Sequence, residues 1–73
     1  MNRYDKFEVI YIFFGPIDGH IESDYLGDMS AEQILRSYPA VREEDLESAK
    51  INGSVTVTLS IASGDMVKLT YMG

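Results

Sequence analysis

The sequence contains no cysteine and no tryptophan, and it has one histidine and two prolines among 73 residues. Without cysteine, the chain can form neither a disulfide framework nor a thiolate zinc site. Its longest unbroken apolar run, residues 9–14, falls far short of the ~20 residues that span a bilayer. The N-terminus mixes acids with bases and lacks a small-residue cleavage site, so no signal peptide is expected. These absences favour one small cytoplasmic domain over residues 1–73.

Basic residues are scarce as well. Six Lys and Arg stand against twelve Asp and Glu, which gives a formal net charge of −6. A surface of this sign repels nucleic acid at long range and attracts partners with basic surfaces. Solubility alone is the more common explanation of such a charge in a small domain.

The clearest local pattern begins with a helix start at Ser30. Its hydroxyl suits an N-cap, and Gln33 stands where a capping box requires it. Met29 and Ile34 occupy the two positions of a hydrophobic staple. Pro39 lacks an amide proton and disfavours helical geometry in the residue before it, so the helix is expected to end there.

A second helix is predicted over about residues 43–50. Acidic residues fill its first turn and Lys50 ends it, which is the arrangement that the helix dipole favours. Gly53 after Asn52 is expected to supply a left-handed C-cap. The expected apolar stripe consists of Val41, Leu46, Ala49 and Ile51.

Residues 7–14 are rich in β-branched and aromatic side chains and predict a strand. Apolar side chains on both of its faces indicate a central strand, or one that is covered on both sides. On the second face, Ile10, Ile12 and Phe14 need a cover, from the chain ends, from residues 15–26 or from another subunit.

Residues 15–19 are dense in turn formers and are expected to close a hairpin. In that register His20 lies opposite Phe14, and Tyr25 lies opposite Val9. Residues 21–26 then form a weak edge strand or an irregular loop that ends at Gly27. The same register pairs Ile21 with Phe13, Glu22 with Ile12, and Asp24 with Ile10.

Residues 54–62 and 66–72 alternate between apolar and polar side chains, which predicts a C-terminal hairpin. A three-residue loop over residues 63–65 keeps the apolar side chains of both strands on one face. The expected pairs are Ile61 with Val67, Leu59 with Leu69, and Val57 with Tyr71. The whole chain is therefore expected to be an α+β domain: an antiparallel sheet of three or four strands with two short helices on one face.

Little in the sequence points to catalysis, and no enzyme or cofactor is expected. Asp18, His20, Glu22 and Asp24 alternate and could hold a cation along one side of a strand. The calcium-loop pattern fails here, because Ser23 stands where a glycine is required. A solvated strand edge is the better interpretation, so no metal site is predicted.

The helical stretch, residues 29–50, resembles the helical segment of a family of small bacterial antitoxin-like domains of unknown function. The residues that carry the resemblance are Ser30, Ala31, Glu32, Ile34, Leu35, Tyr38, Pro39, Val41, Glu44, Asp45, Leu46 and Ala49. It implies a helix-turn-helix and an antitoxin-like transcriptional regulator. Charge opposes DNA reading, because the second helix is mainly acidic and would repel phosphate.

The favoured hypothesis is a non-enzymatic protein that regulates or inhibits a protein partner with a basic surface. The acidic surface of such a protein can imitate phosphate and occupy a nucleic-acid channel, as some phage-encoded inhibitors of host defence, anti-CRISPR proteins among them, do. No direct contact with nucleic acid or membrane is expected. A homodimer through the strand at residues 7–14 is a compatible property. The predicted partner-binding residues are Glu43, Glu44, Glu47, Tyr38 and Tyr25, and Tyr71 is expected to be exposed as well.

Overall fold

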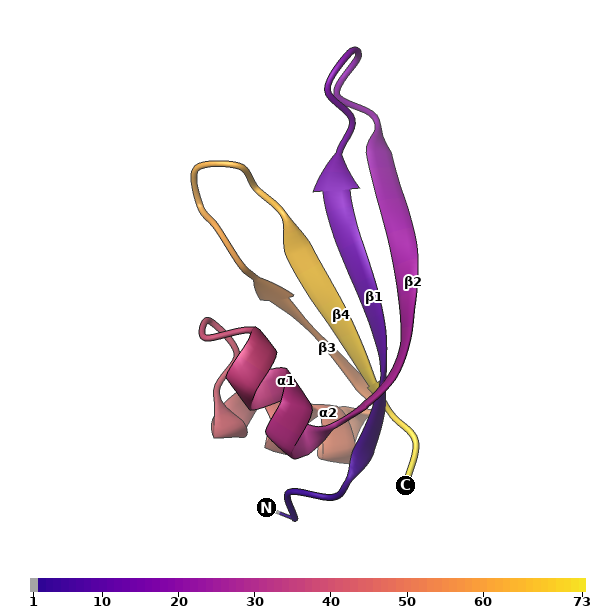
Figure 1. Ribbon diagram of the computed structural model, residues 1–73, viewed down its shortest axis with the longest axis vertical. Coiled ribbons are helices and arrows are strands. Elements are labelled where there is room, and N and C mark those ends of the chain that lie inside the picture. Colours follow the sequence, from indigo (N-terminus) through magenta and orange to yellow (C-terminus); the bar gives the residue numbers. More distant parts are fainter. Residues whose placement is uncertain (1) are drawn as a thin grey trace.

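The strand predicted over residues 7–14 lies in the middle of an antiparallel sheet. The computed structural model describes residues 2–73, in which β1 (Lys6–Phe14) pairs with two neighbouring strands. These are β2 (Ile21–Ser30) on one side and β4 (Met66–Tyr71) on the other. The last strand, β3 (Ser54–Thr58), pairs with β4, so the strand order is β2-β1-β4-β3 (Figure 1).

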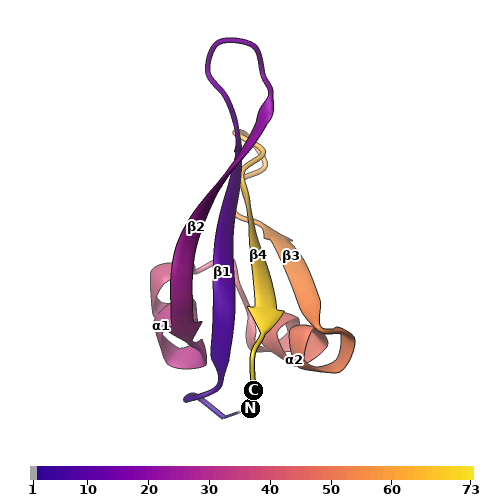
Figure 2. The same ribbon diagram turned by 90° about the vertical axis from the view of Figure 1, so that its right-hand side faces the viewer.

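Two helices, α1 (Ala31–Ser37) and α2 (Glu43–Asn52), lie on one face of this sheet (Figure 2). That side is called the inner face below, and the opposite side the outer face. The α+β class predicted from the sequence is therefore confirmed, with four strands. Neither helix is long and apolar enough to cross a membrane, within residues 2–73.

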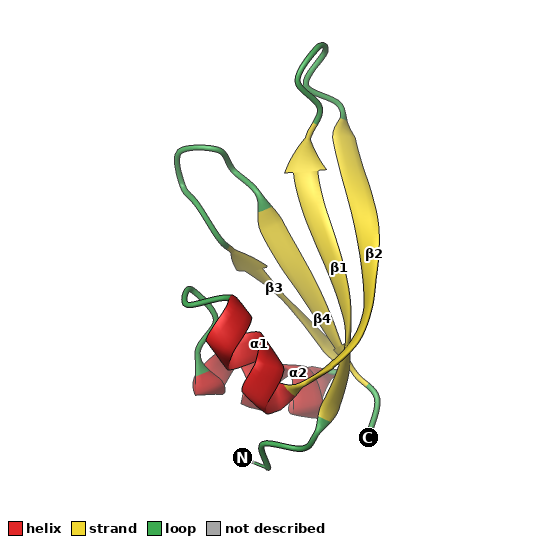
Figure 3. Ribbon diagram, in the orientation of Figure 1, coloured by secondary structure: helices red, strands yellow, loops and turns green. Residues whose placement is uncertain are grey.

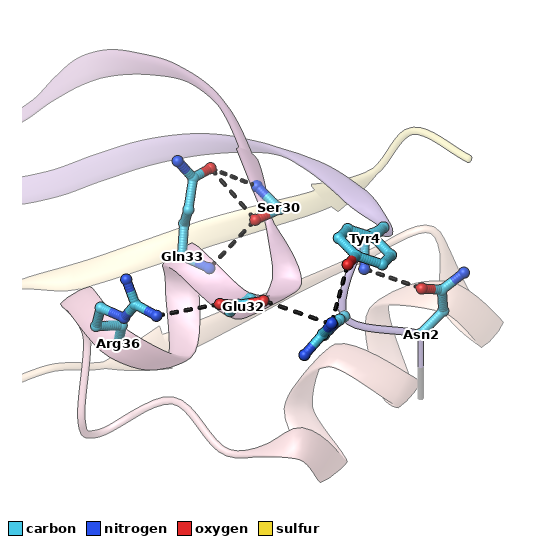
Figure 4. A network of polar contacts seen from close by, with 7 residues as sticks. Asn2, Tyr4, Ser30, Glu32, Gln33 and Arg36 are labelled. Carbon is cyan, nitrogen blue, oxygen red and sulfur yellow. Dashed lines mark hydrogen bonds and ion pairs between the residues drawn. The ribbon is translucent and has the colours of Figure 1, made fainter.

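The helix boundaries follow from local caps. The Ser30 hydroxyl accepts a hydrogen bond from the Gln33 N–H at 3.2 Å, and the Gln33 side-chain oxygen accepts one from the Ser30 N–H at 3.0 Å (Figure 4). This is the predicted capping box. α1 ends at Ser37, just before Tyr38 and the helix-breaking Pro39. α2 runs two residues further than predicted, to Asn52, and Gly53 caps it with a φ of 96°, which glycine adopts without strain.

The core lies between β1, β4 and the two helices. Because side chains alternate along a strand, Phe7 and Val9 both point to the inner face. There the helices remove them completely from solvent. The largest fully buried side chains are Phe7, Val9, Ile34, Leu46, Val67 and Leu69.

A largely buried ion pair ties the N-terminal segment to α2. The Nζ atom of Lys50 lies 2.9 Å from an oxygen of the Asp5 carboxylate, and only 8% of Asp5 is exposed. The same Nζ lies 5.5 Å from the centre of the Tyr71 ring. The hydrogen bond from Lys50 to Asp5 raises the pKa of the Lys50 ammonium. One cation therefore joins the segment before β1, the last turn of α2 and the end of β4.

The β1–β2 hairpin differs from the prediction by one residue. Ile21, not His20, lies opposite Phe14, because the Gly15 N–H donates to the His20 carbonyl at 2.7 Å and closes a four-residue loop over residues 16–19. Tyr25 accordingly lies opposite Ile10 rather than Val9, and its side chain lies on the outer face. The remaining predicted pairs of this hairpin are wrong for the same reason. Ile21 does not pair with Phe13, Glu22 lies opposite Phe13, and Asp24 lies opposite Tyr11.

β2 is also longer than the weak strand predicted to end at Gly27. The register shifts between Val9 and Ile10, and Leu26 is the extra residue of the resulting bulge. Beyond the bulge, Gly27 pairs with Val9 and Met29 pairs with Phe7. Without that shift Asp28 would face Phe7 in the core, so the bulge gives the core position to methionine.

The C-terminal hairpin has the predicted faces but a different offset. Val57 lies opposite Val67, and a longer loop over residues 59–65 connects β3 to β4 (Figure 3). The three predicted pairs, Ile61 with Val67, Leu59 with Leu69, and Val57 with Tyr71, are therefore wrong. The offset is set where α2 ends, since the Tyr71 N–H donates to the Gly53 carbonyl at 2.9 Å.

Two isoleucines expected on the inner apolar surface are instead in solvent. Ile61 lies in the loop and is 96% exposed, and Ile51 on α2 is 80% exposed. The apolar stripe of α2 is thus limited to Leu46 and Ala49, with Val41 just before the helix.

The difference in burial between Leu46 and Ile51 predicts the effect of substituting each of them. Leu46→Ala should lower the free energy of unfolding by about 2–5 kcal/mol, because it removes a fully buried side chain and leaves a cavity. Ile51→Ala should change it by less than about 0.5 kcal/mol. A domain of this size has about 4–11 kcal/mol in all, so urea unfolding will separate the two variants easily. Equal losses would contradict the packing of α2 described above.

Candidate binding surfaces

Charge is divided unevenly between the two faces of the sheet. Strand alternation and the observed register place four charged side chains on the outer face, two of each sign: Lys6, Glu8, Asp28 and Lys68. The remaining ten acidic and four basic residues of the chain lie elsewhere. The outer face is therefore formally neutral, and the net charge of −6 belongs to the rest of the molecule.

Most of the basic residues outside the outer face are already paired. Glu32 binds Arg36 at 3.1 Å and Arg3 at 3.7 Å (Figure 4), and Lys50 is held by Asp5. The acidic residues at the start of α2 have no such neighbours. Glu43 and Glu44 are exposed, and no basic side chain of residues 2–73 lies within ion-pair distance of either. These two carboxylates thus meet water or an external partner.

A second acidic group surrounds two aromatic rings on the inner face, towards the loop end of β1. The rings of Tyr11 and Phe13 stack with their centres 5.3 Å apart. Glu22 lies opposite Phe13 and Asp24 lies opposite Tyr11 on the neighbouring strand. Asp65 approaches from the 59–65 loop. This group is called the aromatic–acidic patch below.

Hydrogen bonds fix the loop to this patch. The Tyr11 hydroxyl donates to Asp65 at 2.8 Å, and the Ser63 hydroxyl donates to the same carboxylate. The bonds from Ser63 and Tyr11 lower the pKa of Asp65. In turn the bond to Asp65, with burial and the charges nearby, raises the pKa of Tyr11. The 59–65 loop is therefore held to β1 by a polar contact, and its residues 59 and 61 do not form the predicted pairs with β4.

The five predicted partner-binding residues do not form one site. Glu43 and Glu44 lie exposed on α2, and Glu47 is half-buried on the same helix. Tyr25 is 64% exposed but lies on the outer face, where its hydroxyl donates to Asp28 at 3.3 Å. The Asp28 charge is the main cause that raises the pKa of Tyr25.

The other two tyrosines expected to be exposed are half-buried. Tyr38 and Tyr71 both pack against the core, and the Tyr71 ring lies 5.5 Å from that of Phe7. Sequence reasoning also missed the aromatic–acidic patch. The one-residue error in the register placed Glu22 and Asp24 beside Ile12 and Ile10, on the outer face, instead of beside the aromatic rings.

The segment around the single histidine is exposed. His20 Nε2 lies 3.4 Å from Asp18, whose carboxylate also accepts a hydrogen bond from the His20 N–H. Within residues 2–73, no three His, Asp or Glu side chains are close enough together to hold a metal ion, and no pocket is present. What the described surface offers chemically is carboxylates and aromatic rings for binding.

Comparison with known proteins adds no relative, since no family model, no curated protein and no solved structure matches the chain. The two acidic groups and the neutral outer face are therefore the basis for a functional proposal.

The contact between Tyr11 and Asp65 predicts a pH effect. Because the pKa of Asp65 is lowered in the folded state, Asp65 stabilises the fold above its unfolded pKa and loses this contribution as the pH falls. Tyr11→Phe removes one of the two side-chain donors, so the pKa of Asp65 should rise towards its usual value. The free energy of unfolding should fall at neutral pH and approach that of the wild type in acid.

Carboxyl NMR titration and urea unfolding measure these two effects. Tyr25→Phe is the matched control, because its hydroxyl binds a different carboxylate. An unchanged Asp65 pKa in Tyr11→Phe would show that the hydrogen bond does not act as described.

Proposed function

We propose that this chain is a non-enzymatic binding protein that engages a protein partner with a basic surface. The surface that binds is the helix side, which consists of α1, α2 and the uncovered part of the inner face. The observation that carries the proposal is the separation of charge, with a neutral outer face and a net charge of −6 over the rest of the molecule. A net charge spread only for solubility has no reason to leave one face neutral. Carboxylates gathered on one side attract a basic partner and orient it during approach.

Glu43 and Glu44 are the residues expected to contribute most on α2. They lie in the first turn of a helix that the buried side chains of Leu46 and Ala49 fix against the core. Their backbone is thus already ordered before binding, which reduces the entropic cost of association. Neither carboxylate has to leave an ion pair within residues 2–73 to meet an Arg or Lys of a partner.

The aromatic–acidic patch offers the same chemistry on the inner face. Stacked rings flanked by carboxylates suit an arginine, which can lie over a ring and donate to a neighbouring acid. Here Tyr11 and Phe13 supply the rings, and Glu22 and Asp24 supply the acids. Two acidic groups on the helix side favour an extended basic surface over a single basic side chain.

In its most specific form the proposal is an inhibitor that occupies the nucleic-acid channel of its partner, as phage-encoded anti-defence proteins of the anti-CRISPR kind do. Small size and excess negative charge support this form. Its carboxylates then take the place of phosphates, and binding should weaken as salt screens the charges.

The alternative proposal is an antitoxin-like transcriptional regulator that uses α1 and α2 as a helix-turn-helix. It is supported by the order of the two helices, which are consecutive and joined by residues 38–42. Opposing it, the first turn of α2 carries Glu43, Glu44 and Asp45, which would repel the phosphates of a DNA groove. A gel shift of the gene's own promoter at low salt, with micromolar protein, would support the regulator.

Partner binding can be tested with two double variants that remove the same charge. Glu43→Gln with Glu44→Gln should reduce capture of the partner from a lysate of the source organism at least about tenfold, the loss expected when charge pairs at an interface are broken. Glu8→Gln with Asp28→Asn, on the outer face, should leave capture close to the wild-type level. Quantitative mass spectrometry of the captured protein measures both. Undiminished capture by the α2 variant would exclude the acidic helix as the binding surface.

A further inference from the structure

The outer face carries apolar side chains that neither helix covers. They form a continuous patch, because the register sets Phe14 beside Ile21, Ile10 beside Tyr25, and Ile12 beside Met66. Ile21 is 68% exposed, Tyr25 64% and Phe14 46%. Both helices lie on the other face, and the two chain ends lie at the opposite end of the molecule from the 15–20 loop (Figures 1 and 2). A continuous apolar patch of this kind marks an interaction surface.

The charge of this face identifies its partner. A second copy of the chain carries the same net charge of −6 and is repelled by every acidic surface of the first. The outer face is the exception, because Lys6 and Lys68 balance Glu8 and Asp28 there. Lys68 forms no ion pair with either acid within residues 2–73. Each copy can therefore supply the opposite charges of the other.

The β2 edge of the sheet, which lies beside the apolar patch, is a poor place for the same association. β2 is the exposed edge next to β1, and pairing two copies of it would bring Glu22, Asp24 and Asp28 close to their equivalents. The bulge at Leu26 also interrupts its row of free backbone groups. Charges and bulges are the usual means by which proteins block edge pairing. Contact between two faces avoids both obstacles.

The size of the face fits a weak dimer. Four strands about 4.8 Å apart, with about 3.3 Å per residue, give a footprint of roughly 19 by 25 Å. Side-chain relief adds to this area, and specific complexes bury about 800 Å² per partner. Nearly complete overlap of two faces is needed, and an interface at this lower end of the size range is typical of weak or transient complexes. We therefore expect a dissociation constant in the micromolar range.

We infer that the outer face of the sheet is the interface of a homodimer, in which the sheets of two copies pack face to face about a two-fold axis. The result is a sandwich in which the two outer faces meet and the helices of each copy lie on the surfaces away from the interface. This inference does not depend on the proposed function. The acidic residues of α2 and of the aromatic–acidic patch stay exposed on both copies.

Sedimentation velocity from low to high micromolar protein tests the dimer directly. The wild type should change from monomer to dimer in this range and form nothing larger. Ile21→Glu places a carboxylate in the interface and should raise the dissociation constant at least about tenfold. Because Ile21 is largely exposed, the substitution disturbs little in the monomer.

Two further variants complete the test. Lys68→Glu makes the face acidic without changing its apolar packing, and it should weaken the dimer as well. Ile51→Glu is the matched control, because Ile51 is 80% exposed on the helix side, and it should leave the dissociation constant unchanged. A wild type that is monomeric at every concentration, assembly beyond the dimer, or equal weakening by Ile51→Glu would overturn the inference. None of these results depends on whether the helix side binds another protein.

Discussion

β1 has apolar side chains on both faces, and the fold buries only one of them. On the inner face, Phe7 and Val9 are fully enclosed by α1, α2 and β4. On the outer face, Ile10 and Ile12 are half-buried among their strand neighbours, and Phe14 remains 46% exposed. Burial of apolar area is the main favourable term in folding. The inner half of β1 therefore supports this small domain, and the outer half remains available for association.

The bulge in β2 makes this division possible. Towards the loop end, β2 points Ile21 and Tyr25 to the outer face, while towards α1 it points Met29 into the core. An unbroken alternation could not do both, because it would bring Asp28 into the core opposite Phe7. The extra residue, Leu26, thus lets β2 direct Met29 towards the core on the inner face and Ile21 and Tyr25 to the apolar patch on the outer face.

The parts of the fold that depend on neighbouring residues could be predicted from the sequence. The box formed by Ser30 and Gln33, the stop before Pro39 and the glycine cap at Gly53 are all local, and each is present. The strand registers predicted from the sequence were wrong, because register depends on contacts between residues that are distant in the chain. Alternation gives the faces of β3 and β4 correctly, but their offset is set by the hydrogen bond from Tyr71 to Gly53, across the end of α2.

The same distinction applies to the candidate surfaces. The exposed acids of α2 could be predicted, because Glu43 and Glu44 stand in the first turn of the helix and unpaired carboxylates are almost never fully buried. The aromatic–acidic patch could not be predicted, since it requires the correct pairing of β1 with β2 and the return of Asp65 to Tyr11. The burial of Tyr38 depends in the same way on packing between elements.

We infer that the two faces of the sheet have separate roles, in which the neutral outer face self-associates and the acidic helix side stays exposed to bind a partner. Solvent paramagnetic relaxation of isoleucine methyl groups, measured by NMR in dilute and in concentrated protein, tests it most directly. The methyls of Ile10, Ile12 and Ile21 should become protected as concentration rises, while that of Ile51 stays accessible. Protection of Ile51, or unchanged accessibility at the three outer positions, would contradict the account.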